Sequence, residues 1–208
     1  MSQHWRKDQA RDRYFRLAKE EGYRSRSAYK LLQINERFGL IHGGNRVLDL
    51  GAAPGGWSQV ASRLVGPQGQ VIAVDLLPMH PLPGVVIIRG DMNSPEVQQQ
   101  IRAAASGEVD VVLCDAAPQV SGIRDRDHAL SIELAEAALS LARELLRAGG
   151  HFVTKVFEGE HFPGYLAEVR RSFASVKPHS PPASRGESRE MYVVARQFHK
   201  RHPEDTYA

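Results

Sequence analysis

The chain has 208 residues, of which 42% are hydrophobic and 25% charged, and it contains one cysteine. This composition is that of a folded globular protein, and it excludes a disordered chain, a disulfide framework and a four-cysteine zinc site. No apolar run reaches the ~18 residues of a membrane span and no signal peptide follows Met1, so we expect a soluble cytoplasmic protein.

The net charge of +3 hides an uneven distribution along the chain. Residues 1–30 carry +5, residues 31–165 carry −5, and residues 166–202 carry +5. Basic ends around an acidic middle favour a polyanion partner such as nucleic acid, although solvated charged helices would give the same pattern. Aromatic residues lie among the basic residues of the first thirty, and they suit either base stacking or docking of a helix.

Strand-like and helix-like segments alternate after a basic arm over residues 1–20. An amphipathic helix is predicted from near Ser27 to Phe38, with Ser25 or Ser27 as its N-cap. The predicted strands are Arg46–Leu50, Gln70–Asp75, Val85–Arg89, Val109–Cys114, His151–Val156 and Tyr192–Phe198, the last pairing with a short strand near Ser175–Lys177. The further predicted helices are Gly55–Val65, a helix from a Ser94 cap to about Ala105, His128–Arg147 with a stop at Gly149 and Gly150, and Gly164–Phe173.

This alternation predicts an α/β domain with a mostly parallel sheet and helices on both faces. We expect one domain over residues 21–200, followed by a tail over residues 201–208. Ligands of such sheets bind at the carboxyl ends of the strands. Asp75, Asp91 and Asp115 follow three strand ends, and a glycine-rich loop follows Leu50, so four strand ends are expected to face one crevice.

The glycine-rich loop fits a loose nucleotide-cofactor pattern through Gly51, Ala53 and Gly56. Such a loop allows close backbone approach to NAD, FAD or S-adenosylmethionine, but an ordinary strand-to-helix turn would also fit. Asp75, at the end of the second strand, is suited to accept hydrogen bonds from ribose hydroxyls. Because Pro54 removes one backbone donor and Trp57 adds bulk, the loop favours a cofactor without phosphates.

Seven segments together resemble the FtsJ/RrmJ family of RNA ribose 2′-O-methyltransferases. The resemblance spans about residues 20–198, and its segments are Tyr23–Leu31, Asp49–Gln59, Asp75–Met79, Gly90–Asp91, Asp115–Pro118, Phe152–Phe157 and Ser184–Tyr192. Two departures are visible. Ala116-Ala117-Pro118-Gln119 stands where the family often has Met-Ala-Pro-Asn, and Arg124–His128 is more charged than in many relatives, so we expect a loop there that touches RNA.

The resemblance implies a Rossmann-like methyltransferase fold with a twisted sheet of about seven strands, the last antiparallel. It implies S-adenosyl-L-methionine as cofactor and a catalytic set of Lys30, Asp115, Lys155 and Glu190. Lys155 stands in an otherwise apolar strand, and a lysine is costly there unless it is paired. The family implies that Lys155 accepts the proton of the hydroxyl, but a charged lysine that orients the hydroxyl stays an alternative.

The cofactor and RNA contacts follow from the same resemblance and from the positions of basic residues. The residues expected to bind the cofactor are Gly51, Ala52, Pro54, Gly55, Gly56, Trp57, Asp75, Leu76, Asp91, Met92 and Asp115. The residues expected to bind RNA are Arg24, Arg26, Lys30, Arg185 and Arg189.

The function that the resemblance implies is methylation of a ribose 2′-hydroxyl in large-subunit ribosomal RNA, at a uridine near the peptidyl-transferase centre. The alternatives are methylation of a tRNA anticodon-loop ribose or an mRNA cap, an NAD-dependent oxidoreductase, and a non-catalytic ribosome assembly factor. We expect a monomer that uses no metal ion and binds no membrane.

Overall fold

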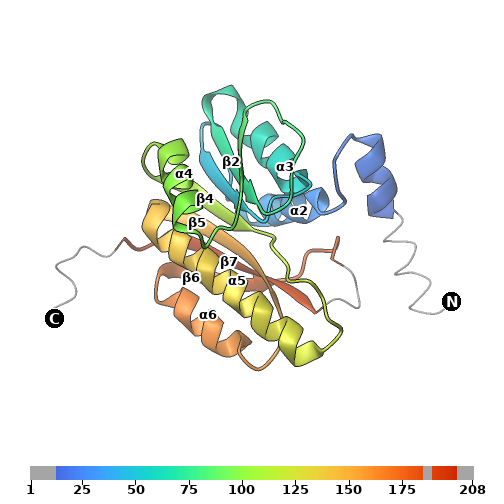
Figure 1. Ribbon diagram of the computed structural model, residues 1–208, viewed down its shortest axis with the longest axis vertical. Helices are drawn as coiled ribbons and strands as arrows, with labels where there is room; N and C mark the ends of the chain where they lie inside the picture. The colour runs from blue at the N-terminus through green and yellow to red at the C-terminus, as the bar shows by residue number, and fades with distance from the viewer. Residues whose placement is uncertain (1–12, 185–188, 201–208) are drawn as a thin grey trace.

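A computed structural model describes residues 13–184 and 189–200, and its centre is one sheet of seven strands (Figure 1). The strands lie in the order β3-β2-β1-β4-β5-β7-β6. Their bounds are β1 Arg46–Leu50, β2 Gln70–Asp75, β3 Val85–Arg89, β4 Val109–Cys114, β5 Leu146–Phe157, β6 Phe173–His179 and β7 Glu190–Phe198. β7 pairs antiparallel with both β5 and β6, and β1 to β5 are parallel to one another. The Rossmann-like α/β fold with an antiparallel last strand is therefore confirmed.

Helices cover both faces of the sheet (Figure 1). On one face lie α2 (Ala28–Phe38) and α3 (Gly56–Val65), and on the other lie α4 (Pro95–Ala105), α5 (Arg124–Leu145) and α6 (Phe162–Arg170). A short 3₁₀ helix, η1 (Gly66–Gln68), follows α3. Each central strand contributes side chains to both cores, because successive side chains point to opposite faces of the sheet.

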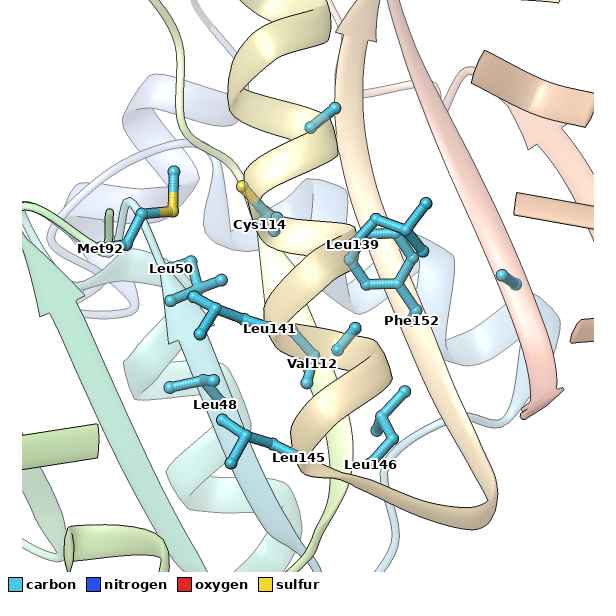
Figure 2. Close-up of a cluster of buried hydrophobic side chains, with 14 of the residues drawn as sticks. Leu48, Leu50, Met92, Val112, Cys114, Leu139, Leu141, Leu145, Leu146 and Phe152 are labelled. Atoms are coloured by element: carbon cyan, nitrogen blue, oxygen red, sulfur yellow. The ribbon is translucent and has the colours of Figure 1, made fainter. Parts of the chain in front are cut away.

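The larger of the two cores lies under α5 (Figure 2). Leu139, Leu141 and Leu145 of α5 pack there with residues of β1, β4 and β5, among them Leu48 and Phe152. Each such side chain contributes roughly 1.5–3 kcal/mol on full burial. This packing fixes β4 and β5 side by side, and these two strands carry Asp115 and Lys155 to the same edge of the sheet.

The structure corrects the prediction between α5 and β5. α5 begins at Arg124 rather than His128, and it ends at Leu145, so Leu146 already pairs with Val109 of β4. The register then shifts, because Val111 pairs with His151. Gly149 has a left-handed φ of 77°, which glycine adopts readily. Gly149 and Gly150 therefore lie at the register shift within β5 and do not end the helix.

Other boundaries also differ from the sequence prediction, and α6 begins at Phe162 rather than Gly164. α6 ends at Arg170, and Phe173 opens β6 instead of closing the helix. β7 begins at Glu190 rather than Tyr192, since Glu190 pairs with Phe157 of β5. Glu190 is therefore the first residue of a strand and not part of the preceding loop.

The predicted helix starts are correct at α2 and α4. Ser94 caps α4 through its hydroxyl, which accepts a hydrogen bond from the Val97 N–H at 3.2 Å. α2 begins after Ser27, but the Ser27 hydroxyl pairs with that of Ser25 and makes no cap. Residues 13–20 are helical, whereas the rest of the predicted arm and the tail over residues 201–208 lie outside the described residues. No helix in the described ranges is both long and apolar enough to cross a membrane.

Candidate active site

The four residues predicted to be catalytic meet at one edge of the sheet. Asp115 follows β4, and Lys155 lies near the end of the parallel strand β5. β7 enters from the same edge because it runs antiparallel, and it brings Glu190 beside them. Lys30 comes from the first turn of α2, which packs on the same face of the sheet as α3.

The four side chains form two lysine–carboxylate pairs. Lys155 Nζ lies 3.0 Å from Asp115 Oδ1 and donates a 2.6 Å hydrogen bond to the Asp115 backbone carbonyl. Lys30 Nζ lies 2.8 Å from Glu190 Oε2. The side chains of the two lysines are only 7% and 8% exposed, so both ammonium groups depend on their partners for compensation.

Tyr192 joins the two pairs, and sequence reasoning assigned it no role. Its hydroxyl donates a 2.8 Å hydrogen bond to Asp115 Oδ1, and Lys30 Nζ lies 5.5 Å from its ring centroid. Burial, with further help from Asp115 and Glu190, raises the pKa of Tyr192 well above its ordinary value. Tyr192 therefore stays a neutral donor, and only its position opposite Lys155 in the β5–β7 register could have pointed to it.

The charge of Lys155 results from two opposing effects. Burial lowers the pKa of Lys155, but Asp115 and Glu190 raise it by more, so the pKa lies above its ordinary value. The free protein consequently holds Lys155 as an ammonium at neutral pH. This state favours an orienting and charge-compensating lysine over one that is ready to accept a proton.

The glycine loop is tied to the end of β2. The Gly51 and Ala52 N–H groups donate to the Val74 carbonyl at 2.9 and 3.2 Å. Gly51 has a φ of 69°, and a Cβ there would lie 2.6 Å from Ala116, so glycine is required by both conformation and space. Asp75 accepts from Ala53 N–H through one oxygen and from Leu77 N–H through the other. Its carboxylate thus orders two loops, and its remaining lone pairs stay available to a ribose.

A buried carboxyl, Asp49, lies directly before this loop and was not among the predicted site residues. Its Oδ2 accepts a 2.6 Å hydrogen bond from the Ser58 hydroxyl, whereas Oδ1 has no hydrogen-bond partner among the described residues. Burial raises the pKa of Asp49 to about 7, which the Ser58 hydrogen bond only partly opposes. An acid in a buried strand next to a glycine loop was the sequence signal for it.

The other predicted cofactor residues differ in their exposure. Leu76 is 65% exposed and Asp91 is exposed, so both remain open to a ligand, whereas Met92 is buried in the larger core. Trp57 is buried in the smaller core, and its indole N–H donates to the Ser27 carbonyl at 2.8 Å. The Trp57 ring therefore packs α3 against α2, and it also lies beside Tyr192 of the site, with 5.7 Å between the ring centroids. A contact of Trp57 with the cofactor stays a prediction.

The predicted RNA-binding residues are used in several ways. Arg24 donates to three backbone carbonyls, and Arg26 donates to the Ala183 carbonyl at 3.2 Å. Arg189 is exposed beside Glu190. Lys30 is buried against Glu190, which suits its predicted catalytic role better than a phosphate contact. Arg185 lies outside the described residues.

The charged stretch Arg124–His128 is not the loop that the sequence suggested. It forms the first turn of α5, because Asp127 accepts hydrogen bonds from Ser121 and Gly122 and so anchors the preceding segment. These hydrogen bonds lower the pKa of Asp127. The anchored segment continues from Asp115, so Asp127 helps to shape the loop that leaves the site.

Within residues 13–184 and 189–200, no group of three or more His, Cys, Asp or Glu side chains could hold a metal ion. Cys114 is buried beside the site, and burial raises the pKa of its thiol to about 11. The side chains paired at this edge are two amines, two carboxylates and one phenol.

Known proteins resemble the chain in sequence and in fold. The profile of the FtsJ-like methyltransferases matches residues 23–198. A protein of Methanothrix thermoacetophila named ribosomal RNA large subunit methyltransferase E is 56% identical over 90% of this chain and 73% of its own length. A protein of the same name from Coxiella burnetii is 46% identical over 95% of both chains. A crystal structure of a Plasmodium falciparum protein described as a ribosomal RNA methyltransferase matches with a TM-score of 0.77 and 27% identity, covering 85% of this chain and 98% of that one.

Proposed function

The chain belongs to the FtsJ-like methyltransferase family, and we propose that it methylates a ribose 2′-hydroxyl of large-subunit ribosomal RNA with S-adenosylmethionine as methyl donor. Within that RNA we propose a uridine of the peptidyl-transferase region, as the sequence resemblance implies. Relatives named as large-subunit ribosomal RNA methyltransferases support a ribosomal over a transfer-RNA substrate.

The observation that carries this proposal is the convergence of two buried lysine–carboxylate pairs beside a glycine loop. Lys155–Asp115 and Lys30–Glu190 meet at the carboxyl edge of a parallel sheet, where such folds bind their ligands. Buried charged pairs cost more than apolar residues of the same size, so their presence at this edge fits a catalytic use. A non-catalytic assembly factor would have no need of them.

The residues around the glycine loop fit a cationic nucleoside cofactor. Asp49 Oδ1, just before the loop, has no hydrogen-bond partner in the part of the chain that the structure describes. Asp75 lies at the end of β2, and Leu76 offers exposed apolar surface next to it. We propose that Asp75 holds the ribose of the cofactor and that Asp91 and Met92 lie at its adenine. When bound, the cofactor supplies a methyl group on a sulfonium centre.

We propose that Lys155 and Asp115 orient the attacking hydroxyl. An alcohol is a weak nucleophile at neutral pH, and it must be held in line with the methyl group, which can contribute ~7–11 kcal/mol. Asp115 accepts the hydroxyl proton, and Lys155, held as an ammonium beside that carboxylate, donates toward the hydroxyl oxygen and offsets the negative charge that loss of the proton leaves there. Tyr192 keeps Asp115 in place, and Lys30 is held by Glu190 beside it.

Replacement of Lys155 tests the proposal. Lys155→Ala is expected to abolish methylation of ribosomal RNA while calorimetry still detects binding of S-adenosylmethionine. Lys200→Ala is the matched control, because Lys200 pairs with Glu108 at the opposite edge of the sheet. A Lys155→Ala protein that methylates at the wild-type rate would refute the proposal.

Two further measurements separate the proposed function from its alternatives. Calorimetry with NADH and with S-adenosylmethionine distinguishes an oxidoreductase from a methyltransferase. Mapping of ribose methylation in cells with and without the protein distinguishes ribosomal from transfer RNA. We also propose that residues 21–200 form one methyltransferase domain that acts as a monomer in the cytoplasm, where its ribosomal substrate is found.

A further inference from the structure

Arg24 links two separate loops at the carboxyl edge of the sheet. Its Nη1 donates to the Pro54 carbonyl at 3.2 Å, in the glycine loop, and to the His80 carbonyl at 2.8 Å. Its Nη2 donates to the Pro81 carbonyl at 2.8 Å. His80 and Pro81 belong to the connection that leaves β2 after Asp75, so one guanidinium links the loops after β1 and β2.

The backbone around Arg24 is fixed to the first turns of α3. The Arg24 N–H donates to Gln59 Oε1 at 2.7 Å, and Gln59 Nε2 donates to the Gly22 carbonyl at 3.0 Å. Gly56 leaves room for this segment, because a Cβ there would lie 2.2 Å from the Ser25 hydroxyl. The guanidinium is therefore delivered to the loops by a segment that is itself anchored.

The same contact is tight on the side of the glycine loop. Gly55 has a φ of 110°, and a Cβ on it would lie 2.9 Å from Arg24 Nη1 and 3.1 Å from Met79 Cε. Met79, in the connection after β2, thus presses against the glycine loop next to Arg24. Residues 76–84 contain no helix or strand, and Leu76 and Leu77 at their start are about two-thirds exposed. Arg89 Nε donates to the Leu76 carbonyl at the start of this connection and the Ser62 hydroxyl to the Pro83 carbonyl near its end, each at 3.3 Å, whereas Arg24 binds its middle, at His80 and Pro81.

We propose that Arg24 is a positioning residue of the cofactor site, which holds the glycine loop and the connection after β2 at the separation that the methyl donor requires. This inference rests on the proposed function. It differs from the expectation, drawn from the position of this basic residue beside the predicted crevice, that Arg24 is a phosphate contact. A guanidinium has five N–H donors in a fixed planar fork, and three hydrogen bonds to carbonyls already orient it inward.

Loss of the Arg24 guanidinium is expected to leave the cofactor site less ordered. Without it, the two loops sample more separations, and the cofactor must select the competent one on binding. The apparent affinity then falls in proportion to the competent fraction. Because the loops after β1 and β2 are already held together in the protein without RNA, the loss of cofactor affinity is expected in the absence of RNA.

A conservative substitution separates this role from phosphate binding. Arg24→Lys keeps the positive charge, so a residue that contacts phosphate would still function, but a single ammonium cannot bridge three carbonyls in two loops. Calorimetry without RNA should give a dissociation constant for S-adenosylmethionine about tenfold higher in both Arg24→Lys and Arg24→Ala. RNA affinity of Arg24→Lys, measured by filter binding, should be unchanged. Arg16→Ala, an exposed arginine in the same basic region, should bind the cofactor like the wild type.

Steady-state kinetics provide a second readout. In Arg24→Lys the KM for the cofactor should rise while kcat at saturating cofactor is largely kept. Mere loss of folded protein would lower the calorimetric stoichiometry and leave the dissociation constant of the remainder unchanged, and that result would overturn the proposal. An unchanged cofactor affinity in both variants would also overturn it. Failure of the wild type to bind S-adenosylmethionine would instead refute the proposed function, so the two failures are distinguishable.

Discussion

The two edges of the sheet use charge in opposite ways. At the carboxyl edge, Lys155–Asp115 and Lys30–Glu190 are largely shielded from water. At the other edge, Arg147–Asp110 and Lys200–Glu108 pair on the surface, with both cations about half exposed. Surface pairs are worth about 0–1 kcal/mol, whereas a buried charge that loses its partner costs several. The pairs at the carboxyl edge therefore depend on their partners far more than the surface pairs do.

The largest expected effect comes from removing the acid of the more buried pair. Asp115→Ala leaves the Lys155 ammonium buried without its counter-ion, so we expect a loss of about 3–5 kcal/mol in the free energy of unfolding. Methylation should fall by at least about a hundredfold, because Lys155 loses the carboxylate that orients it and the reacting hydroxyl loses the same group. Urea unfolding and a methyl-transfer assay check the two effects, and a variant of wild-type stability would show that this pair behaves like a surface pair.

The next effect concerns Asp49, the buried acid at the same edge, and it appears in the pH dependence of stability. The pKa of Asp49 is raised to about 7, while an unfolded aspartate ionises near 4. Between these values the folded state binds more protons, so the free energy of unfolding falls as the pH rises from about 4 to about 7. Asp49→Asn should remove a decrease of a few kcal/mol over that range. Unfolding at pH 5 and pH 8 checks this.

The exposed Glu133 supplies the control for that measurement. Glu133→Gln, on the outer side of α5, should leave the pH dependence of stability as it is in the wild type. If Asp49→Asn keeps the wild-type slope, the buried carboxyl is not the group that titrates between pH 4 and pH 7.

A smaller effect is expected from the second pair of the site. Glu190→Gln keeps the shape of the side chain and removes its charge, so Lys30 retains a hydrogen bond but loses electrostatic compensation. We expect about 1–3 kcal/mol of destabilisation and a loss of activity smaller than that of Asp115→Ala. Comparison of the two variants in one assay ranks the pairs, and equal losses would mean that the four side chains act as one unit.

The smallest effect is expected at the opposite edge. Arg147→Ala removes an exposed pair with Asp110 and should change the free energy of unfolding by less than about 1 kcal/mol, with methylation unaffected. The change should vanish at high salt, because exposed charges are screened. Unfolding in low and high salt provides the measurement, and a large loss that resists salt would contradict the contrast between the edges.

Much of this fold could be predicted from the sequence, because local patterns carry it. Apolar β-branched runs gave β2, β3 and β4 with their observed bounds. The errors lie where distant residues decide the outcome. Leu146 pairs with β4 although it continues a helical pattern, and Glu190 is a strand residue only because Phe157 lies opposite.

The site was predictable in its residues but not in its connections. The resemblance named all four members of the two lysine–carboxylate pairs, and the structure brings them together. The link through Tyr192 depends on the register of β7 against β5. The sequence alone suggests a phosphate contact for Arg24, because the carbonyl groups to which it donates lie thirty or more residues away along the chain. Trp57 lies in the predicted cofactor motif, and its ring also packs in the smaller core, which the motif did not indicate.

The antiparallel course of β7 also decides on which side of the sheet the described part of the chain ends. Glu190 enters at the carboxyl edge, and Phe198 leaves at the opposite one, where Lys200 reaches Glu108 just before β4 begins. An affinity tag or fusion partner joined after residue 200 would thus be tethered on the side of the sheet away from the reacting groups. A fusion at that point should leave the approach of a bulky ribonucleoprotein unobstructed.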